Sequence, residues 1–152
     1  MITLEAIEEK QVEISTMISA FKKQSQQVEY VFPETQITLA PGEHYAGLIL
    51  GKDGESSYHL ILLPREKENI NWTDALQWAK EQGGELPNRR EQSMLYANLK
   101  EEFKESWYWS NTQHASLSGS AWCQNFDYGH QLNIPKGNEL RARAVRRLSV
   151  IQ

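Results

Sequence analysis

The stretch GGELPNRRE, which begins at Gly83, constrains the fold more than any other part of the sequence. Gly83 and Gly84 are the usual residues of a left-handed turn that ends a helix, and Pro87 favours an extended residue before it. Asn88, followed three positions later by Glu91, is typical of a capping box, which begins a helix. The stretch therefore predicts two helices that meet at a set turn.

The two predicted helices carry apolar stripes on either side of this turn. The first is expected to begin with Asn71 or Thr73 as its N-cap. The stripes contain Trp72, Ala75, Leu76 and Ala79 in the first helix, and Leu95, Leu99 and Phe103 in the second. Arg89 and Arg90 fall in the first turn of the second helix, where positive charge is unfavourable. We expect Arg89 to lie against an acid or an aromatic ring and Arg90 to be exposed.

Strand-like segments precede and follow the helices. Two apolar runs, residues 48–50 and 60–63, flank the turn dipeptide Asp53-Gly54 and predict a hairpin of buried strands. Later strand candidates are residues 107–110, 121–126 and 140–148. The last of these has apolar residues on both faces, which predicts a bulge or a two-sided environment. The order of elements predicts an α+β domain.

Residues 1–30 predict a separate helix with the heptad pattern of a coiled coil. Gln11 and Ser25 are polar breaks in one seam. The apolar seam residues, which we predict to be the oligomerisation residues, are Leu4, Ile7, Ile14, Ile18, Phe21 and Val28. We expect a homo-oligomer, dimer or trimer; the alternative is an amphipathic helix packed on its own domain. Residues 31–41 are then a connector and residues 42–152 the folded domain.

Composition limits the class of protein. The chain of 152 residues has 39% hydrophobic and 24% charged residues, as expected for one globular domain. It has no apolar run long enough for a membrane span and no signal-peptide pattern, so we expect no membrane insertion and a cytoplasmic location. A single cysteine, Cys123, agrees with a reducing compartment.

The charge is unevenly distributed. Residues 136–152 hold five lysines and arginines against one acid, whereas the whole chain has a net charge of −4. Such a basic end can contact nucleic acid or pair with the acids of the same domain. Because the remainder of the chain is acidic, we favour pairing within the domain.

Five stretches of the sequence together resemble a known family. The first is Trp72 to Ala75 at the start of the first helix. The other four, residues 83–91, 108–112, 121–129 and 141–147, carry the patterns G-G-x-L-P-x-R-x-E, Y-W-S-x-T, A-W-x-x-x-F-x-x-G and R-x-x-x-V-R-R. Their order resembles the bacterial and phage domains of unknown function that share the C-type-lectin-like fold, among them the C-terminal domain of the Legionella collagen-like adhesin. Formylglycine-generating enzymes and phage tropism proteins are more distantly similar. The resemblance covers residues 42–148.

The resemblance implies two helices on a small, twisted antiparallel sheet whose first and last strands pair, with long irregular loops that carry the ligand surface. This surface corresponds to residues 107–114 and 122–133. The chain lacks the paired cysteines of extracellular lectins, the calcium triplets of sugar-binding lectins and the catalytic cysteine pair of formylglycine-generating enzymes. We therefore expect neither calcium-dependent sugar binding nor oxidase chemistry.

Candidate functional residues lie in the aromatic and polar region after Glu105. The candidate partner-binding residues are Gln113, His114, Asp127, Tyr128, His130, Gln131 and Asn133. We expect Trp109, Trp122 and Phe126 to be core residues and Cys123 to be a small packing residue. The sequence has no hydrolase or zinc-binding spacing, so we expect no enzyme activity, no metal and no cofactor.

These features predict a phage or prophage-type binding module that recognises a protein partner, a host protein if the chain is phage-encoded. The N-terminal helix would oligomerise it. The first alternative is a receptor- or glycan-binding component of a phage particle, which would place it on the virion or at the cell surface. The second is a nucleic-acid-binding accessory protein that uses the basic C-terminal strand, which the acidic remainder disfavours.

Overall fold

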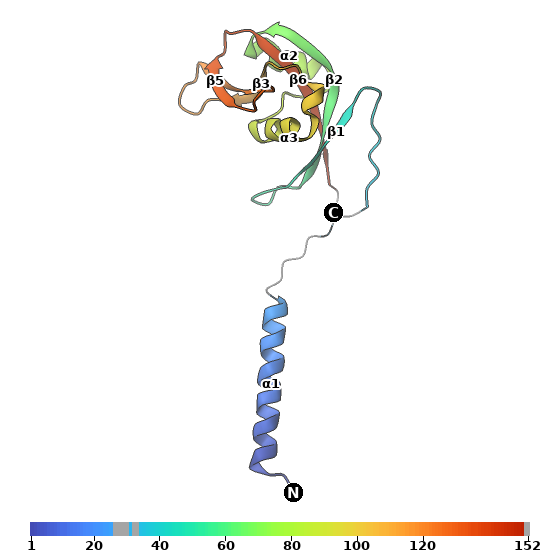
Figure 1. Ribbon diagram of the computed structural model, residues 1–152, viewed down its shortest axis with the longest axis vertical. Coiled ribbons are helices and arrows are strands. Elements are labelled where there is room, and N and C mark those ends of the chain that lie inside the picture. Colours follow the sequence, from blue (N-terminus) through green and yellow to red (C-terminus); the bar gives the residue numbers. More distant parts are fainter. Residues whose placement is uncertain (26–30, 32–33, 151–152) are drawn as a thin grey trace. The chain divides into compact units, whose positions relative to one another are not determined.

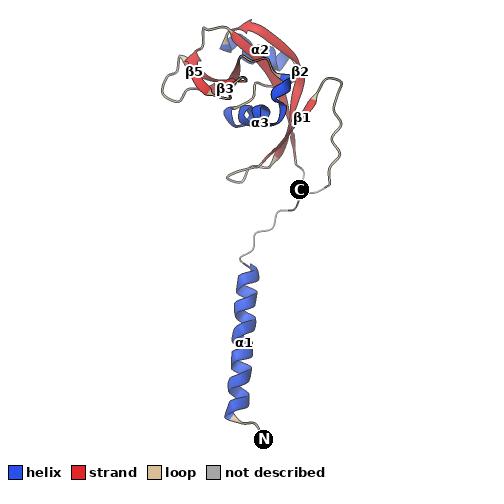
Figure 2. Cartoon of the chain, viewed as in Figure 1, coloured by secondary structure: helices blue, strands red, loops and turns tan. Residues whose placement is uncertain are grey.

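The chain divides into two units, residues 1–36 and residues 37–152, in a computed structural model that describes residues 1–25, 31 and 34–150 (Figure 1). The first unit holds one helix. The second is an α+β unit of strands and shorter helices (Figure 2). The division falls inside the segment for which the sequence predicts a connector.

Helix α1, Leu4–Ser25, has no buried residue. The Thr3 hydroxyl oxygen accepts a hydrogen bond from the Ala6 amide at 3.2 Å, as an N-cap does. Five predicted seam residues are exposed, with exposed fractions from 50% for Ile18 to 70% for Phe21. The sixth, Val28, lies outside the described residues. The helix therefore presents a row of apolar side chains without cover from its own unit.

A six-stranded mixed sheet forms the centre of the second unit, with strand order β1-β2-β6-β3-β4-β5. The strands are β1 His44–Ile49, β2 Tyr58–Ile70, β3 Trp107–Gln113, β4 Ser120–Asn125, β5 Gln131–Pro135 and β6 Leu140–Ser149. All neighbours are antiparallel except β3 and β6, which are parallel. The expected purely antiparallel sheet is therefore wrong, and so is the expected pairing of first and last strands, because β6 inserts between β2 and β3.

The predicted hairpin is confirmed, since β1 and β2 pair antiparallel across a turn that contains Asp53 and Gly54. The expected burial of its first strand is wrong: β1 lies at the edge of the sheet, Leu48 is half-buried, and Leu50 lies beyond β1 and is 47% exposed. Strand β2 continues well beyond the predicted residues 60–63. Its register with β6 shifts between Leu62 and Glu66, next to Pro64, which has no N–H for the ladder. Strand β5 is a further difference, because the sequence predicts only loop there.

The helices α2, Trp72–Glu81, and α3, Arg89–Leu99, cover opposite faces of the sheet. Trp109 lies in the core cluster that contains the buried residues of α2, whereas its neighbour Tyr108 lies in the cluster of α3. Adjacent residues of a strand point to opposite faces, which places one helix on each side. A short 3₁₀ helix, Lys100–Glu102, follows α3, so the buried Phe103 lies beyond α3 and not on its predicted stripe.

The turn between α2 and α3 is tied to the central strand β6. Gly83 has a φ of +85°, the left-handed conformation expected of a C-terminal glycine. The Glu85 amide donates to the Val145 carbonyl at 2.9 Å, and the Val145 amide donates back at 2.8 Å. A Cβ on Gly84 would lie 2.3 Å from that same carbonyl oxygen, so only glycine fits there.

Both predicted helix starts are confirmed. The Asn71 side chain accepts from the Asp74 amide at 2.9 Å at the start of α2. At the start of α3, Asn88 and Glu91 form a complete capping box, with two hydrogen bonds of 2.8 Å. Glu91 is fully buried.

Candidate binding surface

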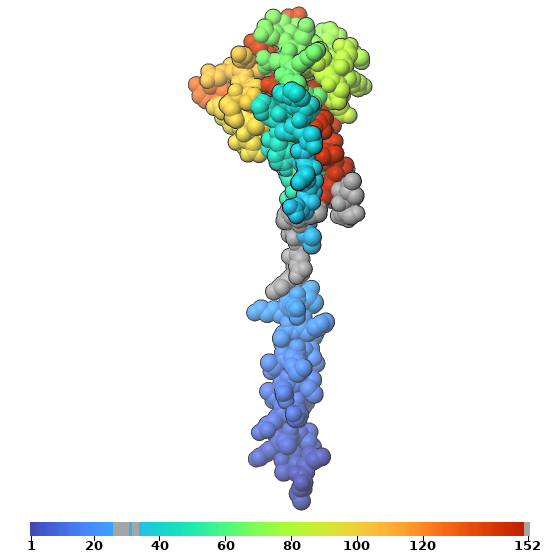
Figure 3. Space-filling model, turned by 90° about the vertical axis from the view of Figure 1, so that its right-hand side faces the viewer, coloured from blue at the N-terminus to red at the C-terminus, as the bar shows by residue number. Residues whose placement is uncertain are grey.

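Residues 106–135 contain one charged residue, Asp127, in thirty positions, whereas the average of 24% for the whole chain would give about seven. This segment forms β3, β4, β5 and their connections, and much of it reaches the surface, in yellow and orange in Figure 3. Depletion of charge together with tyrosine and tryptophan distinguishes the centre of protein interfaces from other surface. This depletion of charge is visible in the sequence alone and adds to the aromatic and polar content from which the surface is predicted.

Trp122 lies at the middle of this segment and is only half-buried, so its predicted place in the core is wrong. Trp109 and Phe126 are buried as predicted. The guanidinium carbon of Arg89 lies 3.6 Å from the centroid of the Trp122 ring, and the His114 ring stacks on it at 5.4 Å. Trp122 is therefore covered by polar groups and not by core side chains.

Arg89 is held in place, as predicted, and the group that it lies against is aromatic. Its Nε donates to Gln131 Oε1 at 3.0 Å. The Gln131 amide nitrogen in turn donates to the Arg89 carbonyl and to Gln124 Oε1, both at 2.8 Å. Gln131 thus joins β5 to α3 and orients the arginine. Arg90 is exposed, as predicted, and donates to the Leu50 carbonyl at 2.8 Å.

Gln113 and His114 hold the loop between β3 and β4. Gln113 Oε1 accepts from Lys136 Nζ at 2.6 Å. His114 Nδ1 accepts from the amides of Ser116 and Leu117 at 3.2 and 3.0 Å. Both side chains are therefore engaged within the domain and can contact a partner only through their remaining exposed edges.

Asp127, Tyr128 and His130 form the turn between β4 and β5. Asn125 Oδ1 accepts from the amides of Asp127 and Tyr128 at 2.7 and 2.8 Å, which fixes the turn. The Tyr128 side chain is 75% exposed, and its ring centroid lies 6.4 Å from that of His130. A rigid turn thus presents an aromatic ring to solvent.

The predicted residues form two groups along one edge of the sheet. Asn133 is exposed and lies directly opposite Trp122 in the register of β4 and β5. The first group is therefore Asn133 together with His114 and Gln131, near the Trp122 ring. The other group is the turn at the far end of β4. We call these residues together the β4–β5 surface: Arg89, Gln113, His114, Trp122, Asp127, Tyr128, His130, Gln131 and Asn133.

The basic C-terminal strand pairs with acids of its own unit, as the sequence predicts. Arg146 binds Glu43 at 2.8 Å, and Arg147 binds Glu91 and Glu85, each at 2.7 Å. Arg141 reaches Glu66 and Glu68 at 3.2 and 3.1 Å, while Arg143 donates to the carbonyls of Glu102 and Leu63. All four guanidinium groups are therefore bound to other groups of the α+β unit.

Cys123 is buried, and the chemistry of its thiol follows from this. Burial raises the pKa of Cys123 to about 12, which leaves the sulfur protonated and weakly nucleophilic at neutral pH.

The described residues contain no group of three or more His, Cys, Asp or Glu placed to hold a metal ion. None of the described helices has the length and apolar character needed to cross a membrane.

We predict that Cys123 reacts with a thiol reagent such as DTNB only when the domain unfolds. In native protein the reaction should be at least about a hundredfold slower than in denaturant, because both burial and the raised pKa suppress the thiolate. A stopped-flow absorbance measurement with and without guanidinium chloride checks this. Rapid native labelling would contradict the buried position.

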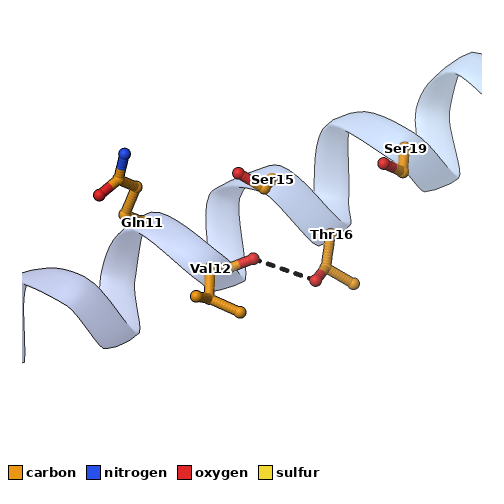
Figure 4. Close-up of a pocket in the computed structure, with 5 residues that line it drawn as sticks. All are labelled: Gln11, Val12, Ser15, Thr16 and Ser19. Carbon is orange, nitrogen blue, oxygen red and sulfur yellow. Dashed lines mark hydrogen bonds between the residues drawn. The ribbon is translucent and has the colours of Figure 1, made fainter.

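Helix α1 carries shallow hollows between its side chains. One is lined by Gln11, Val12, Ser15, Thr16 and Ser19 (Figure 4). Thr16 donates to the Val12 carbonyl at 3.0 Å, so its hydroxyl turns back toward the helix. All five residues belong to one exposed helix, and the hollow is a groove between rows of side chains. Grooves of this kind accept the ridges of another helix.

Comparison with known proteins gives no relative from which a function could be inferred. No protein-family model matches the sequence, and no curated protein does.

Proposed function

We propose that the protein is a non-enzymatic binding module that recognises a protein partner through the β4–β5 surface. The observation that carries this proposal is the segment of thirty residues with one charge, which presents tyrosine, histidine and amide side chains on a fixed strand edge. Tyrosine, serine, glycine and asparagine are also the residues that antibody paratopes favour, because they combine large contact area with adaptable hydrogen bonds.

The C-type-lectin-like fold is the second part of the proposal. Two helices packed on the sheet and irregular connections before the last strand support it. The parallel pair β3–β6 and the separation of β1 from β6 depart from the sheet expected of that fold. The sequence patterns that resemble this family support it as well. In such a fold the sheet and helices supply a rigid base, and the connections supply the contacts.

A protein partner suits the surface better than a glycan or a nucleic acid. Sugars stack on open aromatic rings, but Arg89 and His114 already occupy the Trp122 ring, which leaves Tyr128 as the open ring of this surface. The four arginines of β6 are bound to groups of their own unit, which leaves them poorly placed to contact phosphates. A glycan-binding part of a phage particle is therefore the weaker alternative, and nucleic-acid binding is weaker still.

Helix α1 is proposed to oligomerise the protein as a coiled coil of two or three chains. Its apolar seam is exposed, and burial of such a seam between copies is the usual way to remove it from water. Several copies of a weak site raise the overall affinity by about 10² to 10⁴ without any new contact. In a phage or prophage setting the partner would be a host protein, met in the cytoplasm of the producing cell.

Affinity capture from a host lysate with mass-spectrometric identification tests the function. We predict that Tyr128→Ala with His130→Ala abolishes capture and shifts the melting temperature by no more than a few degrees, because both side chains are exposed. A large loss of stability, or unchanged capture, would contradict this assignment.

The matched control is the other tyrosine–histidine pair of the domain. Tyr45 and His59 have ring centroids 5.6 Å apart and lie on β1 and β2, outside the β4–β5 surface. Tyr45→Ala with His59→Ala should leave capture unchanged. If it abolishes capture as well, the partner binds elsewhere. Capture that is lost on treatment of the lysate with a glycosidase or a nuclease would favour one of the alternatives.

A further inference from the structure

We propose that Arg89 is a binding site for a carboxylate of the partner, the side chain of an aspartate or glutamate. This rests on the proposed function of the β4–β5 surface and names the chemistry that the surface selects. Arg89 is exposed and stands in the first turn of α3, where the helix dipole disfavours a cation. A bound anion would relieve that cost.

The guanidinium group is already held in one orientation. Its central carbon lies 3.6 Å from the centroid of the Trp122 ring, and its Nε donates to Gln131 Oε1 at 3.0 Å. Gln131 is itself anchored to Gln124 and to the Arg89 backbone. Binding therefore costs little of the side-chain entropy that an exposed arginine normally loses.

The two terminal nitrogens of Arg89 are the free part of the group. Within the described part of the chain, Nη1 and Nη2 of Arg89 donate to no carboxylate or carbonyl oxygen, whereas each arginine of β6 donates to one from a terminal nitrogen. Two parallel N–H donors of one guanidinium match the two oxygens of one carboxylate. The segment around Trp122 has no lysine, arginine or glutamate and only one aspartate, Asp127, so the ion pair would form in a surface of low charge density.

A carboxylate fits better than a phosphate. Sites that recognise phosphate groups in proteins gather several arginines, whereas a single guanidinium is oriented here. The nearest basic residue along the segment, Lys136, is bound to Gln113 and lies over the Trp72 ring. A single guanidinium group therefore fits a single planar carboxylate.

The test is an NMR titration of the full-length protein with three probes at constant ionic strength. These are acetyl-Gly-Glu-Gly-amide, its glutamine counterpart and inorganic phosphate. We expect saturable shifts of the Arg89 Nε and Trp122 indole resonances with the glutamate peptide, and at least tenfold weaker effects with the other two. No saturable shift, or equal shifts with the glutamine peptide or with phosphate, would overturn the proposal.

Arg90 supplies a matched control, since it is the neighbouring exposed arginine and lacks the aromatic support. Arg89→Gln should remove the indole shift, whereas Arg90→Gln should keep it. Equal loss in both variants would show general charge attraction and overturn the site. The titration needs no partner, so it is independent of capture: a positive titration with unchanged capture by the Tyr128→Ala, His130→Ala protein rejects the proposed function alone.

Discussion

Replacing Glu91 with glutamine is expected to lower the free energy of unfolding by about 3–5 kcal/mol, because it leaves the Arg147 guanidinium without its buried counter-charge. Glu91 is fully buried and accepts from Arg147 Nε at 2.7 Å, from Tyr58 at 2.8 Å and from the Asn88 amide at 2.8 Å. For a domain of this size, the melting temperature should fall by about 12–20 °C. Differential scanning calorimetry measures this directly.

Glu85 provides the control, because it binds the same arginine from an exposed position. Its side chain is 58% exposed and lies 2.7 Å from Arg147 Nη1. Glu85→Gln should cost no more than about 1 kcal/mol, since exposed ion pairs contribute little. Equal losses in the two variants would show that the charge of Arg147, and not the buried position of Glu91, sets the cost.

The same pair predicts how stability depends on pH. Burial alone would raise the pKa of Glu91, but the hydrogen bonds from Arg147 and Asn88 outweigh it and lower that pKa. A carboxyl with a lowered folded-state pKa stabilises the fold above its unfolded pKa of about 4.3, and this contribution disappears as the pH falls. The difference in stability between the native protein and Glu91→Gln should thus be constant from pH 6 to 8 and shrink below about pH 4.

Replacing Ile14 and Ile18 with aspartate is expected to convert the proposed oligomer into a folded monomer. The two side chains are 57% and 50% exposed on α1, so the change removes no packing within the first unit. Sedimentation velocity should show the loss of assembly, and capture of the partner should weaken by about 10² to 10⁴ with the loss of avidity. A native protein that is already monomeric would reject the proposed role of α1.

Val12 is the matched control for this experiment. It is 66% exposed on the same helix but lies outside the heptad seam. Val12→Asp should leave the assembly intact. Dissociation by Val12→Asp as well would mean that the helix associates through a broad apolar face and not through the predicted seam.

Local patterns predicted the features that depend on neighbouring residues. The capping box of Asn88 and Glu91 and the left-handed Gly83 follow from backbone groups within a few positions, and both are confirmed. The second role of Glu91 was not predictable in this way. Its partner Arg147 is 56 residues further along the chain, and the bridge between Glu85 and Val145, which ties the turn before α3 to β6, brings them together.

For the candidate surface too, the sequence predicted what depends on neighbouring residues and missed what depends on residues distant along the chain. The sequence identified the region and the exposed Tyr128, because aromatic and polar residues in connections are visible without a structure. It misplaced Trp122, since burial was inferred from residue type and the ring is instead covered by Arg89 from another element. It also missed β5, whose five residues, ending in Pro135, are too few and too polar for a clear strand pattern.

Strand β6 comes last of the six along the chain, yet it lies between β2 and β3. During synthesis, the β1–β2 hairpin and the β3–β4–β5 meander can each form once they leave the ribosome, but no strand pairs with both of them until residues 140–149 emerge. Until then β2 and β3 present unpaired edges, which other chains can join. The strand order therefore delays completion of the six-stranded sheet until β6 has been made, and open strand edges of an incomplete chain are sites where aggregation begins.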